Sequence, residues 1–245
     1  MQGQVRATLA LLETLRTDLV QRLSTATGFE VSRLNELLSA LDAGILRFRT
    51  DYAALLEDGQ RALIGLGTDL VTDAVAQVGL AVVAPDVTQS LLTTLSSTRL
   101  ELVTRISANL QTELAREIQL GVLGVKPPFE VIQEVQRLLD TGDAATYASR
   151  AETITRTEIG RAQSQATQAQ LEVAEQQGVK VQKEWRHSGN RNPRSAHVAA
   201  SGQRKPVREP FQVGGVSLMY PRDPAAPPSA TVNCRCIATP YIEVT

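Results

Sequence analysis

The sequence predicts an α+β protein, in which a predominantly helical N-terminal region precedes a small C-terminal β-rich module. Leucine, valine and isoleucine recur every three or four residues through the first 120 residues. Eight of the eleven prolines, in contrast, fall in the last 53 residues. Aromatic residues make up 4% of the chain and apolar residues 42%, so the core is expected to be aliphatic, as in packed helices.

The first elements are predicted to be amphipathic helices. Apolar residues at positions 5, 9, 12, 15, 19 and 23 form one stripe, and those from Val31 to Ile45 form a second, with Gly28 as the break between them. Four glycines between positions 59 and 79 punctuate the next apolar stretch, which is also expected to be helical. A longer helix is predicted to start at Pro85 and to end at the glycines and prolines between positions 121 and 128.

These stripes have two interpretations. They pack together as the core of a helical bundle, which is the common case. Alternatively, one long face docks on a partner helix in a larger assembly. The periodicity is the same in both cases, so the sequence leaves the choice open, and residues 1–124 are treated as one helical arm or bundle.

Residues 125–245 form the second predicted region. Two helices are expected within 129–177, and Gly178 ends the second of them. The valines and the tryptophan of 179–185 are spaced two or four apart, which is typical of a half-buried strand. Short apolar runs separated by proline and glycine follow, so residues 179–245 are predicted to form the β-rich module.

Charge and composition exclude several classes of protein. The formal net charge is −1, so the chain as a whole does not have the charge of a polyanion-binding protein. No run of 18 apolar residues occurs and the N-terminus contains acidic residues, so neither a membrane span nor an export signal is expected. Cys234 and Cys236 lie too close in sequence for an ordinary disulfide with each other, which excludes a disulfide scaffold.

The module contains a basic segment between positions 186 and 208, with no acidic residue in it. Such a segment is typical of contact with a phosphate backbone or with an acidic protein surface. The alternative is a solvated loop whose charge keeps a small module soluble. The candidate DNA- or partner-binding residues are Arg186, Arg191, Arg194, Arg204, Lys205 and Arg208.

The two cysteines are candidate metal ligands. Side chains two residues apart on a strand point to the same side, so both thiols would face one point. His197 and His187 could complete the soft ligand set that a zinc ion prefers. Structural zinc sites more often use C-x2-C than C-x-C, and buried free cysteines are common, so packing without a metal is the alternative. Zinc is the cofactor that these residues indicate, with His197, Cys234, Cys236 and His187 as candidate ligands.

No catalytic motif is present. The chain lacks G-x-S-x-G, G-x-x-x-x-G-K-[ST] and H-E-x-x-H. A metal-dependent nuclease could use His187, Asn190 and His197, but no acidic residue lies between them to complete its metal site. The sequence therefore predicts a protein that is not an enzyme.

Spaced motifs run through residues 125–240. They include RTEIGRAQSQA from Arg156, GVKVQKEW from Gly178, HVAASG from His197, YPRDP from Tyr220 and finally Asn233-C-R-C. In this order they resemble the phage Mu F-like family, which are minor head proteins of tailed bacteriophages, also called head morphogenesis proteins. The resemblance covers about half of the chain.

The resemblance implies a structural minor capsid protein, present in a few copies inside the head and associated with the portal vertex. It implies a role in head morphogenesis and in DNA packaging or delivery. The expected partners are the portal protein, the major capsid or scaffolding protein and double-stranded DNA. The expected location is the virion, inside the head, and the host cytoplasm during assembly. Residues 1–124 would dock on portal or capsid, and residues 125–245 would be the Mu F-like domain.

Some members of the family have a C-x-x-C pair where this chain has Arg194 and His197, followed by the same N-C-x-C ending. That pattern would make a four-thiolate metal site, of which this chain would keep three ligands. The alternative function is a metal-dependent nuclease or a toxin-like effector built on the same module. Chains with such toxins usually carry a further domain after N-C-x-C, whereas nine residues follow Cys236 here, which favours the structural role.

Overall fold

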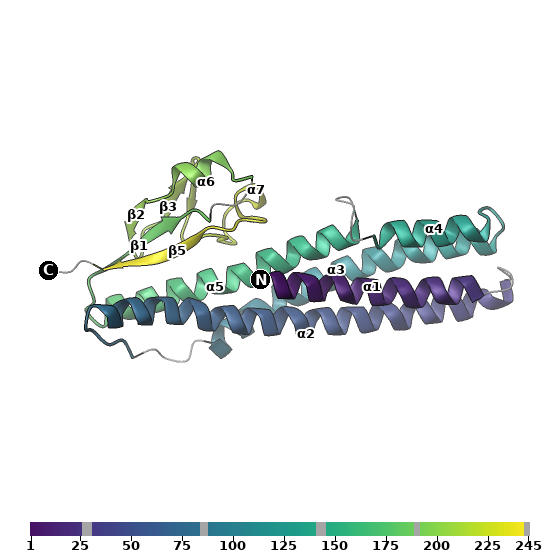
Figure 1. The fold of residues 1–245 in the computed structure, drawn as a ribbon, viewed down its shortest axis with the longest axis horizontal. Coiled ribbons are helices and arrows are strands. Elements are labelled where there is room, and N and C mark those ends of the chain that lie inside the picture. The colour runs from purple at the N-terminus through teal and green to yellow at the C-terminus, as the bar shows by residue number, and fades with distance from the viewer. Residues whose placement is uncertain (26–30, 84–87, 141–145, 189–191, 243–245) are drawn as a thin grey trace. The chain divides into compact units, whose positions relative to one another are not determined.

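The structure is a computed structural model of the chain, and it describes residues 1–25, 31–83, 88–140, 146–188 and 192–242. It confirms the α+β fold class, with long helices first and strands after them (Figure 1). The predicted breaks at Gly28 and Pro85 fall outside the described residues. The helices are α1 (Gln2–Thr25), α2 (Val31–Gln77), α3 (Thr88–Val122), α4 (Pro128–Leu138), α5 (Tyr147–Gln176), α6 (Ser195–Ala199) and α7 (Pro228–Thr231).

The chain forms two compact units, and each is built from two stretches of sequence. The first unit contains residues 1–56 and 97–155, and the second contains residues 57–96 and 156–245. Three helices, α2, α3 and α5, therefore contribute residues to both units. The two regions predicted from the sequence, 1–124 and 125–245, were defined by motifs and composition. Their boundary therefore does not coincide with the limits of the two compact units.

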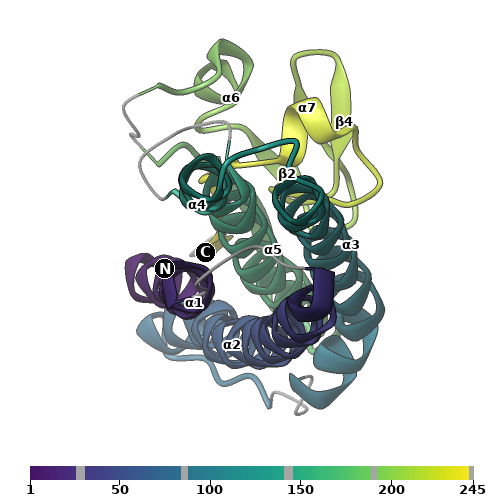
Figure 2. The ribbon, with the colours of Figure 1, turned by 90° about the vertical axis from the view of Figure 1, so that its right-hand side faces the viewer.

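The first unit is a bundle of helices that lie side by side (Figure 2). The leucines of the stripe in α1, from Leu12 to Leu23, are at most 5% exposed, and α4 packs against α1. From α2, the fully buried Tyr52 donates a hydrogen bond to the carbonyl oxygen of Ala151 in α5 at 2.7 Å. In this unit the stripes therefore form a bundle core, which is the first of the two interpretations.

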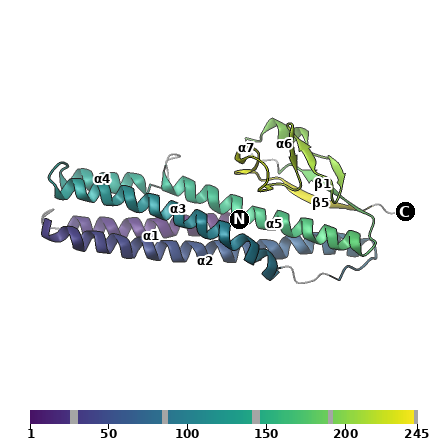
Figure 3. The ribbon, with the colours of Figure 1, turned by 180° about the vertical axis from the view of Figure 1, so that it is seen from behind.

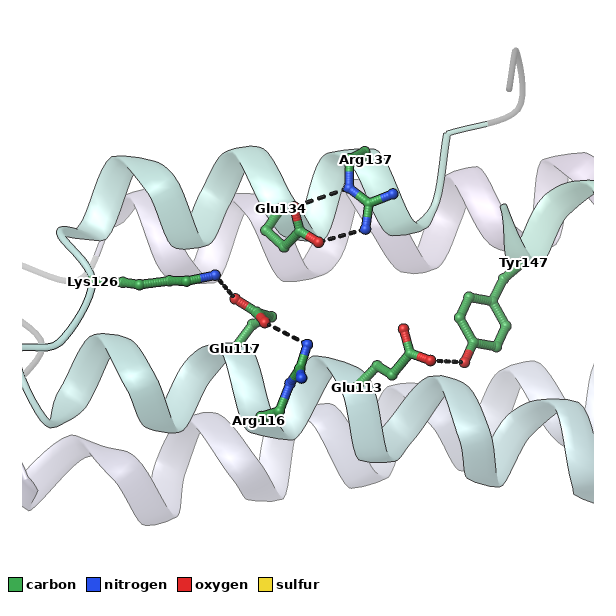
Figure 4. Close-up of polar contacts among 7 residues, drawn as sticks. All are labelled: Glu113, Arg116, Glu117, Lys126, Glu134, Arg137 and Tyr147. Carbon is green, nitrogen blue, oxygen red and sulfur yellow. Dashed lines mark hydrogen bonds and ion pairs between the residues drawn. The ribbon is translucent and has the colours of Figure 1, made fainter. Parts of the chain in front are cut away.

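Ionic contacts hold the C-terminal end of α3 in the first unit (Figure 4). The carboxylate of Glu117 is buried. Lys126 Nζ lies 2.5 Å from Oε2 of Glu117, and Arg116 Nη2 lies 3.1 Å from Oε1. Tyr147 donates its hydroxyl to Glu113 at 2.8 Å, and burial together with this carboxylate raises the pKa of Tyr147 to about 12. These contacts tie the turn after α3 and the start of α5 to one face of α3.

The glycines that punctuate the sequence after position 59 do not interrupt α2, which continues for 47 residues. Gly67 lies at a close approach to α5 within the second unit. A Cβ atom at this position would lie 2.6 Å from the carbonyl oxygen of Gln163, and Thr167 Oγ1 donates a hydrogen bond to the Gly67 carbonyl at 3.2 Å. Gly67 therefore permits close helix packing, whereas Gly79, with φ of 77°, lies in the turn after the helix.

The second unit contains the strands, which in the described part of the chain occur only after residue 178, as predicted. In the three-stranded sheet β1 lies between β2 and β5 and is antiparallel to both, and β1 and β5 are side by side in Figure 3. The fully buried rings of Trp185 and Phe211, whose centroids are 5.3 Å apart, lie in the core of the module. The strands are β1 (Val181–Arg186), β2 (Arg204–Pro206), β3 (Phe211–Val213), β4 (Val216–Leu218) and β5 (Ile237–Ile242).

A hydrophobic cluster within the second unit joins the module to its helices. Val71 and Val75 of α2 and Leu171 of α5 are fully buried, and they pack with valines of the module that include Val181 and Val207. The module therefore does not depend on its own small core alone. Among the described residues, no helix contains a stretch that is both long and apolar enough to span a membrane.

Candidate metal centre

Three buried side chains of the second unit converge on one point. Nδ1 of His197 lies 3.5 Å from Sγ of Cys234 and 3.5 Å from Sγ of Cys236. The three potential ligand atoms all lie within 4.8 Å of one another. The residues are 4%, 5% and 2% exposed, respectively. The structure thus brings together three of the four candidate ligands.

His197 is positioned by α6, a short helix in a part of the module that the sequence predicted only as loop. The imidazole packs edge-on against Trp185 of β1, with ring centroids 5.6 Å apart. Arg194, which immediately precedes α6, donates a hydrogen bond from Nη2 to the carbonyl oxygen of Val232 at 2.8 Å. That bond ties the helix carrying His197 to the segment that leads into the two cysteines.

Cys234 and Cys236 lie in the segment directly before β5. The prediction that they lie on a strand is therefore wrong. Both are buried while Arg235 between them is exposed, so the two-residue alternation holds without strand pairing. Asn233 has φ of 56°, a left-handed conformation that asparagine tolerates better than most residues, and its N–H donates to Thr157 Oγ1 at 3.1 Å. The N-C-x-C motif is therefore a turn anchored on α5, followed by two thiols that face the same side.

Arg222 is a buried residue of the site that the sequence analysis did not select. It donates from Nη1 to the Cys234 carbonyl oxygen at 2.6 Å and from Nη2 to Ser164 Oγ at 3.2 Å. The guanidinium lies against Gly160 of α5, where a Cβ atom would come within 2.8 Å of it. Burial lowers the pKa of Arg222, and the charge of the nearby cysteine sulfurs opposes that shift. The YPRDP motif, which contains this arginine, is the signal that could have found it.

A buried ion pair fastens the YPRDP segment to α5. Glu158 accepts two hydrogen bonds from Arg161 Nη1, at 2.7 and 2.6 Å, and Arg161 Nε donates to the Arg222 carbonyl oxygen at 3.1 Å. Burial raises the pKa of Glu158, while the Arg161 charge lowers it. Asp223 accepts two backbone N–H bonds at 2.8 and 2.9 Å. The motifs at residues 156–166 and 220–224 thus pack against each other, and Arg222 connects them to the backbone of Cys234.

A pocket of about 430 Å³ lies beside the three converging side chains. His187 and Arg156 line it together with His197 and both cysteines. His187 does not belong to the group of three whose ligand atoms lie within 4.8 Å, so the structure separates this fourth candidate from the others among the described residues. Two thiols and an imidazole are donors that zinc prefers, so the residues present fit that ion.

Two basic residues of the predicted segment are paired with the same acidic residue. Arg186 and Arg204 both contact Glu184, with N–O distances of 2.9 and 3.0 Å. The Arg204 guanidinium also lies 3.6 Å from the centroid of the Tyr241 ring. Glu184 comes from β1, two residues before the segment begins, so the absence of acids within the segment did not predict its local charge.

The remaining candidates of the segment have different surroundings. Arg208 pairs with Glu175 of α5 at 3.0 Å. Arg194 is exposed and bonds the backbone as described, and Lys205 is half-buried on β2. Arg191 lies outside the described residues. Three of the five candidates that the structure describes are paired with acids, so these five do not form one uncompensated positive surface.

Comparison with known proteins gives a family match and two curated relatives. A family model described as Phage Mu protein F like protein matches residues 108–239. "Uncharacterized protein YqbB" of Bacillus subtilis is 39% identical over 98 residues, which are 38% of this chain and 31% of that protein. "NAD(+)--arginine ADP-ribosyltransferase EFV" of Enterococcus faecalis is 30% identical over 131 residues, 54% of this chain and 26% of that protein. The chain thus spans less than a third of either relative, and no solved structure matches it.

Proposed function

The chain belongs to the phage Mu protein F-like family, and on that basis we propose that it is a structural minor head protein of a tailed bacteriophage, acting in head morphogenesis at the portal vertex. The single observation that carries the proposal is the family match over residues 108–239. The matched stretch includes the part of α5 from residue 156 on, the YPRDP segment and N-C-x-C, which are packed together in the second unit. The family itself supports a phage head-related protein, and the location at the portal is our proposal.

The proposal assigns the portal protein as the main partner and the major capsid or scaffolding protein as a second one. We assign docking to the N-terminal helical region, residues 1–124, most of which precedes the family match. The protein would be present in the host cytoplasm during assembly and then inside the virion, with a role in DNA packaging or delivery.

The test uses the phage or prophage genome that encodes the chain. A nonsense codon early in the gene is expected to abolish DNA-filled heads, and the full-length chain supplied in trans is expected to restore them. Mass spectrometry of purified procapsids and virions is expected to detect the protein. Normal yields of infectious particles from the nonsense mutant, with no trace of the protein in particles, would contradict the proposal.

Portal capture should use the full chain. A cut near residue 120 would divide both units, because each unit contains residues from before and after that position. The tagged chain is expected to retain the portal protein of the same genome. A matched column carrying an unrelated helical protein controls for non-specific retention.

The name of the Enterococcus faecalis relative favours a second candidate, a toxin-like effector. The match covers 26% of that relative, so the activity in its name belongs to a much longer protein. Under our proposal the full chain neither transfers ADP-ribose from labelled NAD⁺ to an arginine-rich acceptor nor cleaves double-stranded DNA with added divalent metal. Incorporation or cleavage above that of heat-denatured protein would replace the structural role with an enzymatic one.

A further inference from the structure

We propose that His197, Cys234 and Cys236 bind one zinc ion, through Nδ1 and the two sulfurs, and that the fourth coordination position faces the adjacent pocket. This inference is independent of the proposed head function, because a metal-stabilised module can exist in a protein of any role. It differs from a closed four-thiolate site, since this chain offers two thiols and one imidazole.

The distances match the edges of a tetrahedral zinc site. With Zn–S bonds of about 2.3 Å and Zn–N bonds of about 2.0–2.1 Å, a ligating nitrogen and sulfur lie about 3.5–3.6 Å apart. Nδ1 of His197 lies 3.5 Å from both sulfurs. A ring nitrogen has either one hydrogen or one lone pair, so it cannot form good hydrogen bonds to both sulfurs at once. One cation at the common centre satisfies all three atoms.

The three ligands are held in place by groups outside the centre. Arg222 donates to the carbonyl oxygen of Cys234, and the N–H of the preceding Asn233 donates to Thr157 on α5. The imidazole of His197 packs against the fully buried Trp185. A metal site needs this kind of support, because ligands whose rotamers are fixed in advance lose little entropy when the ion binds.

The fourth coordination position of the proposed zinc ion is open to solvent in the pocket. Structural zinc sites usually have four protein ligands, whereas sites with three keep a position for water. The pocket of about 430 Å³ borders all three ligands and is large enough for several water molecules. His187 lines the same pocket but lies outside the group of three, so we assign the fourth position to water and not to this histidine.

The first experiment measures metal in the full chain. Protein purified without chelator is expected to contain one zinc per chain by plasma mass spectrometry. After exchange for cobalt, thiolate-to-cobalt charge-transfer bands and intense visible bands of a tetrahedral ion are expected. Parent protein without zinc that also gives no cobalt bands would overturn the proposal.

The second experiment assigns the ligands. Cys234→Ser and Cys236→Ser are each expected to reduce bound zinc and shift the cobalt bands, because each removes one sulfur. His187→Ala is the matched control and is expected to retain one zinc with an unchanged spectrum. Full zinc in both serine variants would overturn the assignment, and loss of zinc in His187→Ala would overturn the three-ligand site.

A measurement on the parent chain covers the case in which the serine variants do not fold. Titration with an organomercurial reagent, which captures thiolates, is expected to release one zinc as the two cysteines react. Release of zinc by this route supports thiolate ligation without any substitution. Zinc that stays bound after both thiols have reacted would overturn the proposal, while head assembly in the phage remains a separate test of function.

Discussion

Lys183 is a fully buried lysine on β1, at the centre of the small sheet. Its ammonium donates to the carbonyl oxygen of Met219 at 2.7 Å and to Gln168 Oε1 at 3.2 Å. It also lies 5.2 Å from the centroid of the Phe211 ring. Neutral acceptors and an aromatic ring therefore surround a charge that would be fully hydrated in the unfolded chain.

This burial predicts a pH-dependent stability. Burial lowers the pKa of Lys183 from 10.5 to about 8, although the charges of Glu172, Asp223 and Glu209 act in the opposite direction. Between these two values the unfolded chain binds more protons than the folded chain, so the free energy of unfolding rises with pH. The contribution of Lys183 is expected to rise by up to about 3 kcal/mol from pH 8 to pH 10.5.

Urea unfolding of the parent and of Lys183→Met at pH 8 and at pH 10 measures this contribution. Methionine has a similar length and cannot titrate, so the difference between the two proteins isolates the lysine. The parent is expected to gain stability relative to the variant as the pH rises. A constant difference between the two proteins would show that the buried ammonium does not titrate in this range.

The residues of the candidate site were only partly predictable. His197, Cys234 and Cys236 could be selected as candidate ligands because of their residue types and the two-residue spacing of the cysteines. The residue type of Arg222 gives no such indication, because arginine is normally exposed and the burial of Arg222 depends on Gly160 and on Ser164 of α5. Only its place in the YPRDP motif could have selected it. The sequence also did not predict that acids compensate part of the charge of the basic segment, since the pairing of Arg186 and Arg204 with Glu184 depends on strand geometry.

Among the helices, α2 illustrates the difference between a helix-breaking residue and a packing residue. Gly65 and Gly67 both weaken helix propensity, and the sequence alone gives them the same meaning. A Cβ atom at Gly65 would have nothing within 4 Å, whereas one at Gly67 would overlap the backbone of Gln163 in α5. Only Gly67 is therefore needed for the contact between α2 and α5 in the second unit.

Gly67→Ala is expected to destabilise the protein by about 1–3 kcal/mol, because the added methyl group forces the two helices apart. Gly65→Ala is the matched control and is expected to stabilise the protein by about 0.5–1 kcal/mol, since alanine restricts the unfolded chain. Thermal unfolding followed by circular dichroism measures both effects. Equal shifts in the two variants would mean that the helices do not approach closely at Gly67.

The elements themselves were predictable to different degrees. The aliphatic stripes predicted long helices because a 3.6-residue repeat continued over many turns is a strong local signal. The short strands β2, β3 and β4 and the helices α6 and α7 have three to five residues each, too few to carry a periodic pattern. Of these elements, β3, β4 and α6 contribute to the core cluster around Trp185 and β2 pairs with β1, so their positions depend on long-range contacts.

At the scale of the whole molecule, double-stranded DNA stays a proposed partner, and the salt dependence of binding tests it. Arg194 is exposed and Lys205 half-buried, and no ion pair described here involves either. Neutralising both, as Arg194→Gln with Lys205→Gln, is expected to lower the slope of log affinity against log salt by about 2 if both contact phosphates. Fluorescence anisotropy with a labelled duplex measures that slope.

A variant with Arg6→Gln and Arg49→Gln is the matched control for DNA binding. These two exposed arginines lie in the first unit, and their replacement changes the net charge by the same amount. The control is expected to keep the salt slope of the parent. Equal slopes in all three proteins would show that Arg194 and Lys205 do not contact phosphates of the duplex.

The pairing of β5 with β1 has a consequence for the chain as it leaves the ribosome. The first unit uses no residue beyond 155, so its helices can pack while the module is still being translated. β1 is complete when residue 186 has emerged and β5 only when residue 242 has, 56 positions later, a delay of roughly 3–11 s at about 5–20 residues per second. During that interval one edge of β1 is unpaired, and an unpaired edge can add a strand from another nascent chain. We therefore expect prompt completion of translation to shorten the time for which this edge of β1 can pair with another chain.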